Sequence, residues 1–327
     1  MLKDKKLTQK IQELSKKYLA TGQDIYSFLD GLLYSDYMGY WDYIHLDTLL
    51  TLQTPKTDFP DENIFILYHQ ITELYFKLCL LEIEQINKNG KKIAENGQDL
   101  GWNHKLKVDL FIKKMKRINR YLKQLINSFN IMTEGMDKDQ FLKFRMSLLP
   151  SSGFQSVQYR MIELRSTSLE NLHHNQTEET KSIETVFNQL YWQMGANDLD
   201  SGEKTYTLKQ FEKKYKKRLL KLANRMQNLN LLSKYNSLAE EDKKNKELIS
   251  LLKEYDLNIN VNWKLAHYKS AVKYLHMKKN DIAATGGTNW QQYLPPKFQK
   301  IIFFPKLWTN KEKENWGKKW VESILEK

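Results

Sequence analysis

The sequence has few of the residues that mark several common protein classes. It contains one cysteine, Cys79, in 327 residues, so it cannot form an internal disulfide and has no cysteine-rich metal site. Proline and glycine are scarce, at 6 and 13 residues. Apolar residues recur mostly at helical spacing, and strict alternation is rare. These features predict an all-α protein.

Long apolar runs are also missing, since none approaches the roughly 20 residues that a membrane-spanning helix needs. The first residues, MLKDKKLTQKIQELSKKYL, are charged throughout and lack the apolar centre of a secretory signal. The motifs of P-loop, dinucleotide-binding, serine-hydrolase and HExxH metal sites are absent. We therefore expect a soluble, cytoplasmic protein without a membrane partner.

Positive charge is in excess, with 52 Lys and Arg against 39 Asp and Glu and a formal net charge of +13. Such a balance is found in proteins that bind nucleic acid or an acidic partner. In FIKKMKRINRYLKQL and FEKKYKKRLLKLANRM, however, apolar residues take one helical face and basic residues the other. We interpret most of this charge as solvated helix surface and predict no nucleic-acid partner. A basic partner-binding surface stays an open alternative.

The spacing of the helix-breaking segments predicts one domain over residues 1–327, a helical bundle of about ten to twelve helices with no long flexible linker. Breaks fall at TPKTDFPD, NGKKIAENGQDLG, LPSSG, TGG and LPP. The expected helices cover residues 5–19, 22–33, 40–53, 61–88, 103–131, 137–148, 154–165, 178–195, 205–233, 239–254, 260–279 and 309–325.

The stretch FILYHQITELYF, residues 65–76, places His69 in a helix that is apolar nearly all round. Such a helix is typically buried at the centre of a bundle. Phe65 lies one turn before His69 on the same face. Two interpretations stay open, a core histidine satisfied by a neighbouring carbonyl and a histidine that faces a buried ligand.

An arginine stands in the apolar segment FLKFRMSLLP. On a helix Phe141, Arg145 and Leu148 would share one face. A buried guanidinium needs an anionic partner, and it matches a carboxylate through two parallel hydrogen bonds. The arginine either forms a structural pair with a glutamate, extends to the surface, or binds a substrate carboxylate.

A second histidine, His267, lies in VNWKLAHYKSAVKYL with Trp263 one turn before it. Ser270 and Ala271, about one turn later on the same face, are small and leave room for a flat group such as a porphyrin. Ordinary packing explains the pattern equally well. The later ATGGTN segment can hold a polar ligand group or form a plain turn.

Together these segments resemble the tryptophan 2,3-dioxygenase family. The resemblance is carried in collinear order by YWDYIHLDTLLTLQ, DENIFILYHQITELYFKL, FLKFRMSLLPSSGFQSVQYRMIE, WKLAH, TGG and FPKLW. It implies an all-α protein with a buried haem b site that usually forms a homotetramer. It also implies that an N-terminal helical segment, about residues 1–55, packs on a neighbouring subunit.

The resemblance also implies roles for particular residues. His267 is similar to the axial ligand of the haem iron, and His69 to the catalytic histidine near the indole N–H. Residues expected to line the substrate pocket or to contact the substrate are Phe65, Phe141, Leu148, Arg145 for the carboxylate, Thr285 for the ammonium, and Tyr40, Tyr43 and Ile44 from a neighbouring subunit. Ser152 and Gly153 are expected over the haem.

The implied reaction is addition of O2 across the indole C2–C3 bond of L-tryptophan, giving N-formylkynurenine in tryptophan catabolism by the kynurenine pathway. The segment AATGGTNWQQYL departs from the family's GTGGSSG-like loop, and Thr285 lies farther from His267 than in the family. His276 is therefore a rival iron ligand. Two other functions stay open, a haem-dependent monooxygenase of a modified tryptophan or another aromatic amino acid, and a non-catalytic basic helical binding protein.

Overall fold

The computed structural model describes residues 4–35, 38–148, 153–173, 182–194, 196, 203–275 and 300–317. The chain divides into two compact units, Met1–Thr54 and Pro55–Lys327. The division falls beside the end of the N-terminal segment that was expected to pack on a neighbouring subunit. That packing stays a prediction, and the two units are described separately.

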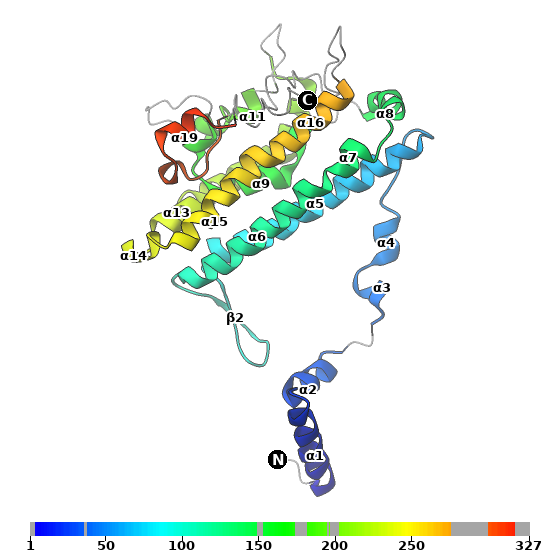
Figure 1. Cartoon of the computed structure of the whole chain (residues 1–327), viewed down its shortest axis with the longest axis vertical. Coiled ribbons are helices and arrows are strands. Elements are labelled where there is room, and N and C mark those ends of the chain that lie inside the picture. The colour runs from blue at the N-terminus through cyan, green and yellow to red at the C-terminus, as the bar shows by residue number, and fades with distance from the viewer. Residues whose placement is uncertain are drawn as a thin grey trace. The chain divides into compact units, whose positions relative to one another are not determined.

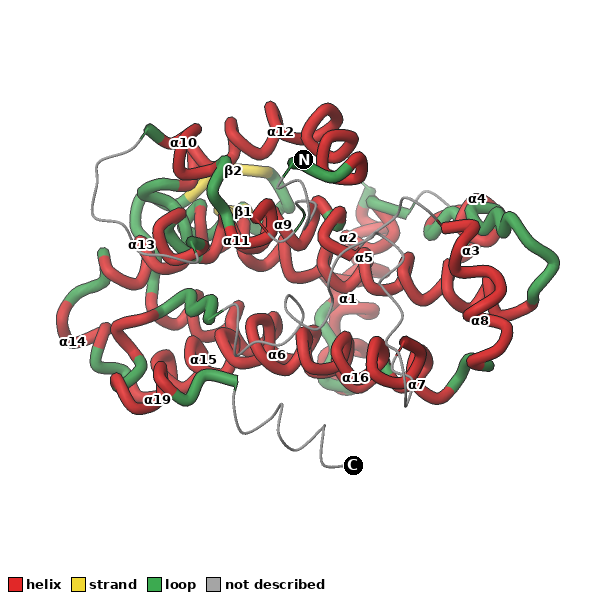
Figure 2. The backbone as a smooth tube through the Cα atoms, turned by 90° about the horizontal axis from the view of Figure 1, so that it is seen from above, coloured by secondary structure: helices red, strands yellow, loops and turns green. Residues whose placement is uncertain are grey.

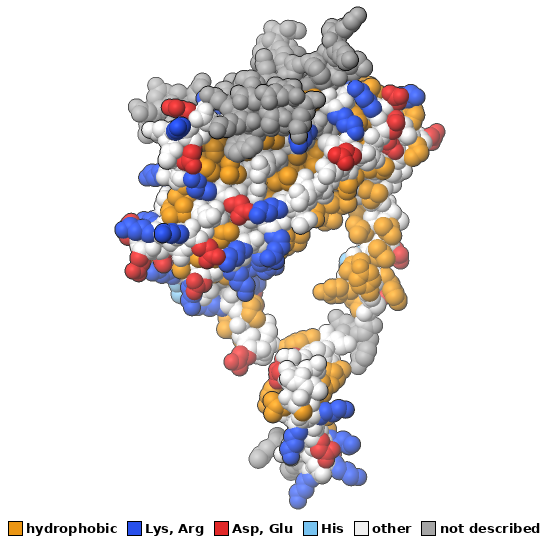
Figure 3. Space-filling model, in the orientation of Figure 1, with side chains coloured by type: hydrophobic (Ala, Val, Ile, Leu, Met, Phe, Trp, Pro, Cys, Tyr) orange, Lys and Arg blue, Asp and Glu red, His pale blue; other side chains and the backbone are white. Residues whose placement is uncertain are grey.

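The first unit contains short helices and almost no core. They are α1 (Lys5–Ala20), α2 (Ile25–Leu33), α3 (Tyr40–Tyr43) and α4 (Leu46–Leu50). The expected helix 40–53 divides because His45 has a left-handed backbone, with φ of 53°. Among the described residues of this unit only Ile25 is buried, and hydrophobic side chains gather on the surface of α3 and α4 (Figure 3).

The second unit is built on long helices that lie side by side (Figures 1 and 2). They are α5 (Pro60–Asn87), α6 (Val108–Ser128), α9 (Val157–Ser166) and α15 (Lys246–Leu257). Helix α5 packs against both α6 and α9, and α15 packs against α6. Fully buried side chains such as Phe76, Ile83, Phe111 and Met115 belong to the common core.

The remaining elements complete this unit. The α-helices are α7 (Asn130–Glu134), α8 (Lys138–Phe144), α10 (Ile183–Phe187), α11 (Tyr191–Met194), α12 (Tyr206–Met226), α13 (Leu231–Asn236), α14 (Glu240–Lys243), α16 (Trp263–Leu275) and α19 (Asn310–Glu314). The 3-10 turns are Arg145–Leu148, Gly153–Gln155, Leu169–Leu172 and Pro305–Leu307, and Asn258–Asn262 is π-helical. The strands β1 (Lys91–Ile93) and β2 (Asp99–Trp102) form a small antiparallel hairpin where a break was expected. The all-α prediction is confirmed.

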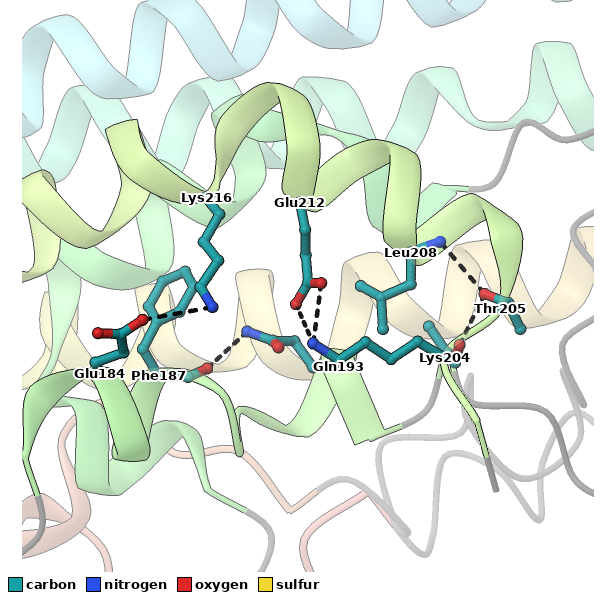
Figure 4. Close-up of polar contacts among 9 residues, drawn as sticks. Glu184, Phe187, Gln193, Lys204, Thr205, Leu208, Glu212 and Lys216 are labelled. Carbon is teal, nitrogen blue, oxygen red and sulfur yellow. Dashed lines mark hydrogen bonds and ion pairs between the residues drawn. The ribbon is translucent and has the colours of Figure 1, made fainter. Parts of the chain in front are cut away.

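Helix α12 is attached along one edge by polar contacts (Figure 4). Lys204 pairs with Glu212 at 2.7 Å, and Lys216 lies 3.6 Å from Glu184 at the start of α10. The Thr205 hydroxyl caps the helix by accepting from the Leu208 N–H. These contacts hold α12 in place, and the helix packs against α9.

The expectation that no apolar run reaches membrane length was wrong for α5. This helix is long and apolar enough, by length and composition alone, to cross a membrane. The central helix of a soluble bundle has the same composition, and α5 buries Phe76 and Ile83 in the core. Its other face exposes an apolar stripe made of Leu67, Ile71, Leu74, Leu78 and Leu81.

Candidate functional site

A cavity of about 160 Å³ lies among α5, α7, α8 and α16. Two histidines line it, His69 from α5 and His267 from α16. Phe65 and Phe141 contribute aromatic walls, and most of the remaining lining is apolar. The structure therefore brings the two candidate histidines to one cavity. The two phenylalanines that were expected to line the substrate pocket lie in the same cavity wall.

Contacts at both ends of this cavity position its walls. At the start of α5 the Asp61 carboxylate accepts from the Asp137 N–H at 2.6 Å, which places α8 and Phe141 beside α5. On the other side the Tyr274 hydroxyl donates to the carbonyl of Met132 at 2.6 Å, which anchors α16 to α7.

His69 is held in one orientation by its own helix. Its Nδ1 lies 2.7 Å from the carbonyl oxygen of Phe65, one turn earlier. Since a carbonyl only accepts, Nδ1 carries the proton and the neutral ring keeps a lone pair on Nε2. The ring packs on Phe65 with centroids 4.1 Å apart, and its remaining surface borders the cavity. Desolvation by the surrounding side chains lowers the pKa of His69, although part of the residue is exposed, so the neutral form is favoured.

His267 is also a neutral imidazole. Trp263 and Phe129 contact its ring edge-on, with centroids at 4.7 Å and 4.9 Å. Burial, together with the nearby His69, lowers its pKa to about 4, so a ring nitrogen has a free lone pair at neutral pH. Ser270 and Ala271 line the same cavity, as expected of residues that leave space for a flat group.

The helix that carries His267 has an irregular start. Helix α15 runs into the π-helical turn Asn258–Asn262, which continues directly into α16 at Trp263. π-Helical turns occur frequently at functional sites because they shift the register of the side chains that follow. The expected helix 260–279 did not include this feature.

The segment around Arg145 differs from the expected continuous helix. Helix α8 ends at Phe144, and Arg145–Leu148 forms a 3-10 turn, so the expected helix 137–148 changes its winding at Arg145. The Arg145 N–H still donates to the Phe141 carbonyl one turn earlier. Phe141 lines the cavity, whereas Arg145 and Leu148 are not among its lining residues. The Arg145 side chain is nevertheless buried, at 5% exposure, and this burial lowers its pKa.

The other predicted site residues lie elsewhere. Tyr40, Tyr43 and Ile44 belong to the first unit, where all three are exposed. Gly153 begins a 3-10 turn ahead of α9. Ser152, Thr285 and the rival ligand His276 lie outside the described residues.

Sequence reasoning did not assign several residues of the cavity wall, among them Tyr68, Phe129, Met132 and Leu275. Phe129 matters most because its ring touches both Trp263 and His267. It stands between α6 and α7, inside the single helix that was expected over residues 103–131. Phe129 continues the buried stripe of α6 that Leu122 and Leu125 form at helical spacing, so this periodicity is the signal that could have identified it.

The fold and site define an all-α protein with an aromatic small-molecule cavity that contains two neutral histidines. The model of the tryptophan 2,3-dioxygenase family matches residues 31–268. The chain belongs to this family, which confirms the resemblance found in its motifs and the expectation of an oxidoreductase family.

Individual relatives are similar over different lengths. Tryptophan 2,3-dioxygenase of Ruegeria sp. (strain TM1040) is 38% identical over 130 residues, 40% of this chain and 42% of that protein. That of Polaromonas naphthalenivorans (strain CJ2) is 35% identical over 40% of this chain and 41% of that protein. The enzyme of Pseudomonas fluorescens is 25% identical over 84% of this chain and 91% of that protein. The chain therefore aligns with less than half of the first two relatives, and more weakly with nearly all of the third.

Proposed function

We propose that this protein is a haem-dependent dioxygenase that converts L-tryptophan and O2 into N-formylkynurenine. The observation that carries the proposal is the placement of His69 and His267, two neutral histidines, on one aromatic cavity. Membership of the tryptophan 2,3-dioxygenase family supports the substrate and the reaction class.

The residues around His267 fit a haem. Its pKa of about 4 leaves the imidazole neutral, which is the form that ligates iron. The side chains of Ser270 and Ala271 are small and leave space beside His267 for a flat ring. His267 would hold the iron, and the haem would supply the activation of O2.

The chain's own contribution is to bind and orient tryptophan in a site that excludes water. Nε2 of His69 accepts the indole N–H, because Nδ1 already donates to Phe65. Phe65 and Phe141 pack against the indole ring. Arg145 binds the substrate carboxylate through paired hydrogen bonds, and its place one turn after Phe141 supports this role.

We further propose that the chain acts as a homotetramer in the cytoplasm, within tryptophan catabolism. The first unit supports association, since its described residues expose large side chains that include Tyr40, Trp41 and Tyr43. Exposed apolar surface of this extent marks interaction sites. Sedimentation of the full chain tests this part, and a monomer at working concentration would refute it.

The reaction is tested with the full chain supplied with haem and reductant, then mixed with L-tryptophan in air. We expect N-formylkynurenine to accumulate, and we expect no product from the His267→Ala variant. A histidine-ligated haem spectrum without product from tryptophan would refute this substrate and direct the search to other aromatic amino acids.

A further inference from the structure

A second cavity, of about 290 Å³, lies between α5, α9 and α12 and shares no lining residue with the histidine cavity. Part of its wall is apolar and includes Leu80, Val157 and Met161. Basic residues, among them Arg165 and Arg218, also line it. None of these residues has a role in the proposed dioxygenase reaction.

Arg165 is the main feature of this cavity. Its side chain is only 7% exposed, and its Nε is buried without a hydrogen-bond partner. Nη1 donates to the Asn87 side-chain oxygen at 3.4 Å, and no carboxylate of the described residues lies within 4.0 Å. Glu84 attracts Arg165 only from beyond this distance, and a buried guanidinium without an anion in contact is costly, since it has lost its hydration.

Asn87 orients this guanidinium. Its side-chain amide donates to the carbonyls of Leu229, at 2.7 Å, and of Arg165 itself, at 3.3 Å. The asparagine is therefore fixed, and so is the oxygen that accepts from Arg165. A group held in advance in this way loses little freedom when a ligand binds.

The surrounding charges leave the cavity positive. Arg218 of α12 donates to the Met161 sulfur at 3.7 Å, which is a weak acceptor, and Lys77 forms no ion pair within the described part of the chain. The one acidic lining residue, Glu84, is bonded to Lys88 at 2.7 Å.

We propose that this cavity binds a small phosphate-bearing molecule, with its oxyanion on Arg165 and Arg218 and its apolar part against Val157 and Met161. Guanidinium groups match the planar, paired acceptors of a phosphate. Three cations that contact no carboxylate of the described residues within 4.0 Å, these two arginines and Lys77, favour a doubly charged phosphate over a single carboxylate.

Calorimetric titration of the full chain with inorganic phosphate and with phenyl phosphate tests the proposal, at ionic strength held constant with NaCl. We expect saturable binding of one ligand per chain, tighter for phenyl phosphate because of the apolar wall. Arg218→Gln, a change at an exposed position, and Arg165→Met should each weaken binding about tenfold or more, the scale of a lost charged hydrogen bond. The matched control is Arg120→Gln, an exposed arginine in a different basic groove, which should leave the affinity unchanged.

Thermal unfolding without phosphate separates this role from a structural one. A binding arginine predicts that Arg165→Met keeps or raises the unfolding temperature of the phosphate-free protein, because the uncompensated charge is removed. Haem loading and tryptophan turnover should be unchanged in both arginine variants, so the result does not depend on the dioxygenase proposal. Absence of saturable binding, equal weakening by Arg120→Gln, or a change of oligomeric state in Arg165→Met without phosphate binding would each overturn the inference.

Discussion

Nδ1 of His69 lies 2.7 Å from the carbonyl oxygen of Phe65, so the backbone of α5 sets the tautomer of the histidine that faces the cavity. The carbonyl satisfies one ring nitrogen and leaves the other as an acceptor. The two interpretations of His69 that the sequence left open are therefore compatible in part: the ring is satisfied by a neighbouring carbonyl and also borders the cavity, although the residue is exposed rather than in the core.

Replacement of His69 should remove one hydrogen bond to the substrate. For His69→Phe we expect kcat/KM for tryptophan to fall by about 2- to 10-fold, the effect of one neutral hydrogen bond of about 0.5–1.5 kcal/mol. 1-Methyltryptophan, which has no indole N–H, is the control substrate. The ratio of kcat/KM for the two substrates should shrink in His69→Phe, and an unchanged ratio would refute the hydrogen bond.

Replacement of His267 should abolish haem ligation. In His267→Ala we expect the spectrum of a histidine-ligated haem to disappear, since the second cavity histidine is held by Phe65 through Nδ1 and sits on another helix. His104→Ala, at an exposed position, serves as the control and should keep the spectrum of the unmodified protein. Retention of a normal spectrum in His267→Ala would assign the iron to a different ligand, with His276 the first to test.

Replacement of Arg145 should mainly weaken substrate binding. We expect Arg145→Ala to raise KM for tryptophan by an amount equivalent to about 2–4 kcal/mol, the scale for loss of one partner of a buried charge pair. Tryptamine, which lacks the carboxylate, separates this effect from damage to the fold. An equal loss of activity toward tryptamine would assign Arg145 a structural role.

Lys264 gives the protein a pH-dependent stability. Its amine is buried, has no hydrogen-bond partner among the described residues and lies 4.7 Å from the Tyr191 ring. Burial lowers its pKa from 10.5 to about 7, although Glu163 opposes the shift. Between pH 7 and pH 10.5 the unfolded chain therefore binds more protons than the folded one. The free energy of unfolding rises with pH across this range, and the buried charge of Lys264 destabilises the fold most at and below about pH 7.

Lys264→Met should accordingly raise the free energy of unfolding near pH 7 by about 1–3 kcal/mol. The gain should shrink as the pH rises, because the native lysine then loses its charge in both states. Denaturant titrations of both proteins across this pH range measure it. A Lys264→Met protein that is less stable than the native one near pH 7 would show that the amine forms a favourable pair with Glu163.

Helical periodicity was sufficient to predict the fold class, whereas the roles of the two histidines came only from the resemblance to the family. The run around His69 is apolar on nearly every side, yet only one face of α5 is buried, and the other exposes the stripe Leu67 to Leu81. Trp263, Ser270 and Ala271 share a helix face with His267 at fixed spacing, so their common lining of the cavity follows from helix geometry alone.

Features that depend on where helices end were not predictable in this way. The expected helix 40–53 divides at His45, and α8 tightens into a 3-10 turn at Arg145. The π-helical turn before Trp263 adds a residue that a constant period does not anticipate. Such ends are decided by packing between distant segments rather than by local propensity.

The reaction itself is tested most directly by turnover of L-tryptophan under dioxygen labelled with heavy oxygen, followed by mass spectrometry of the product. Addition of O2 across the indole C2–C3 bond predicts N-formylkynurenine that carries two heavy oxygen atoms. A hydroxylated product with a single heavy oxygen atom would contradict the dioxygenase account and assign the two-histidine cavity to a monooxygenase.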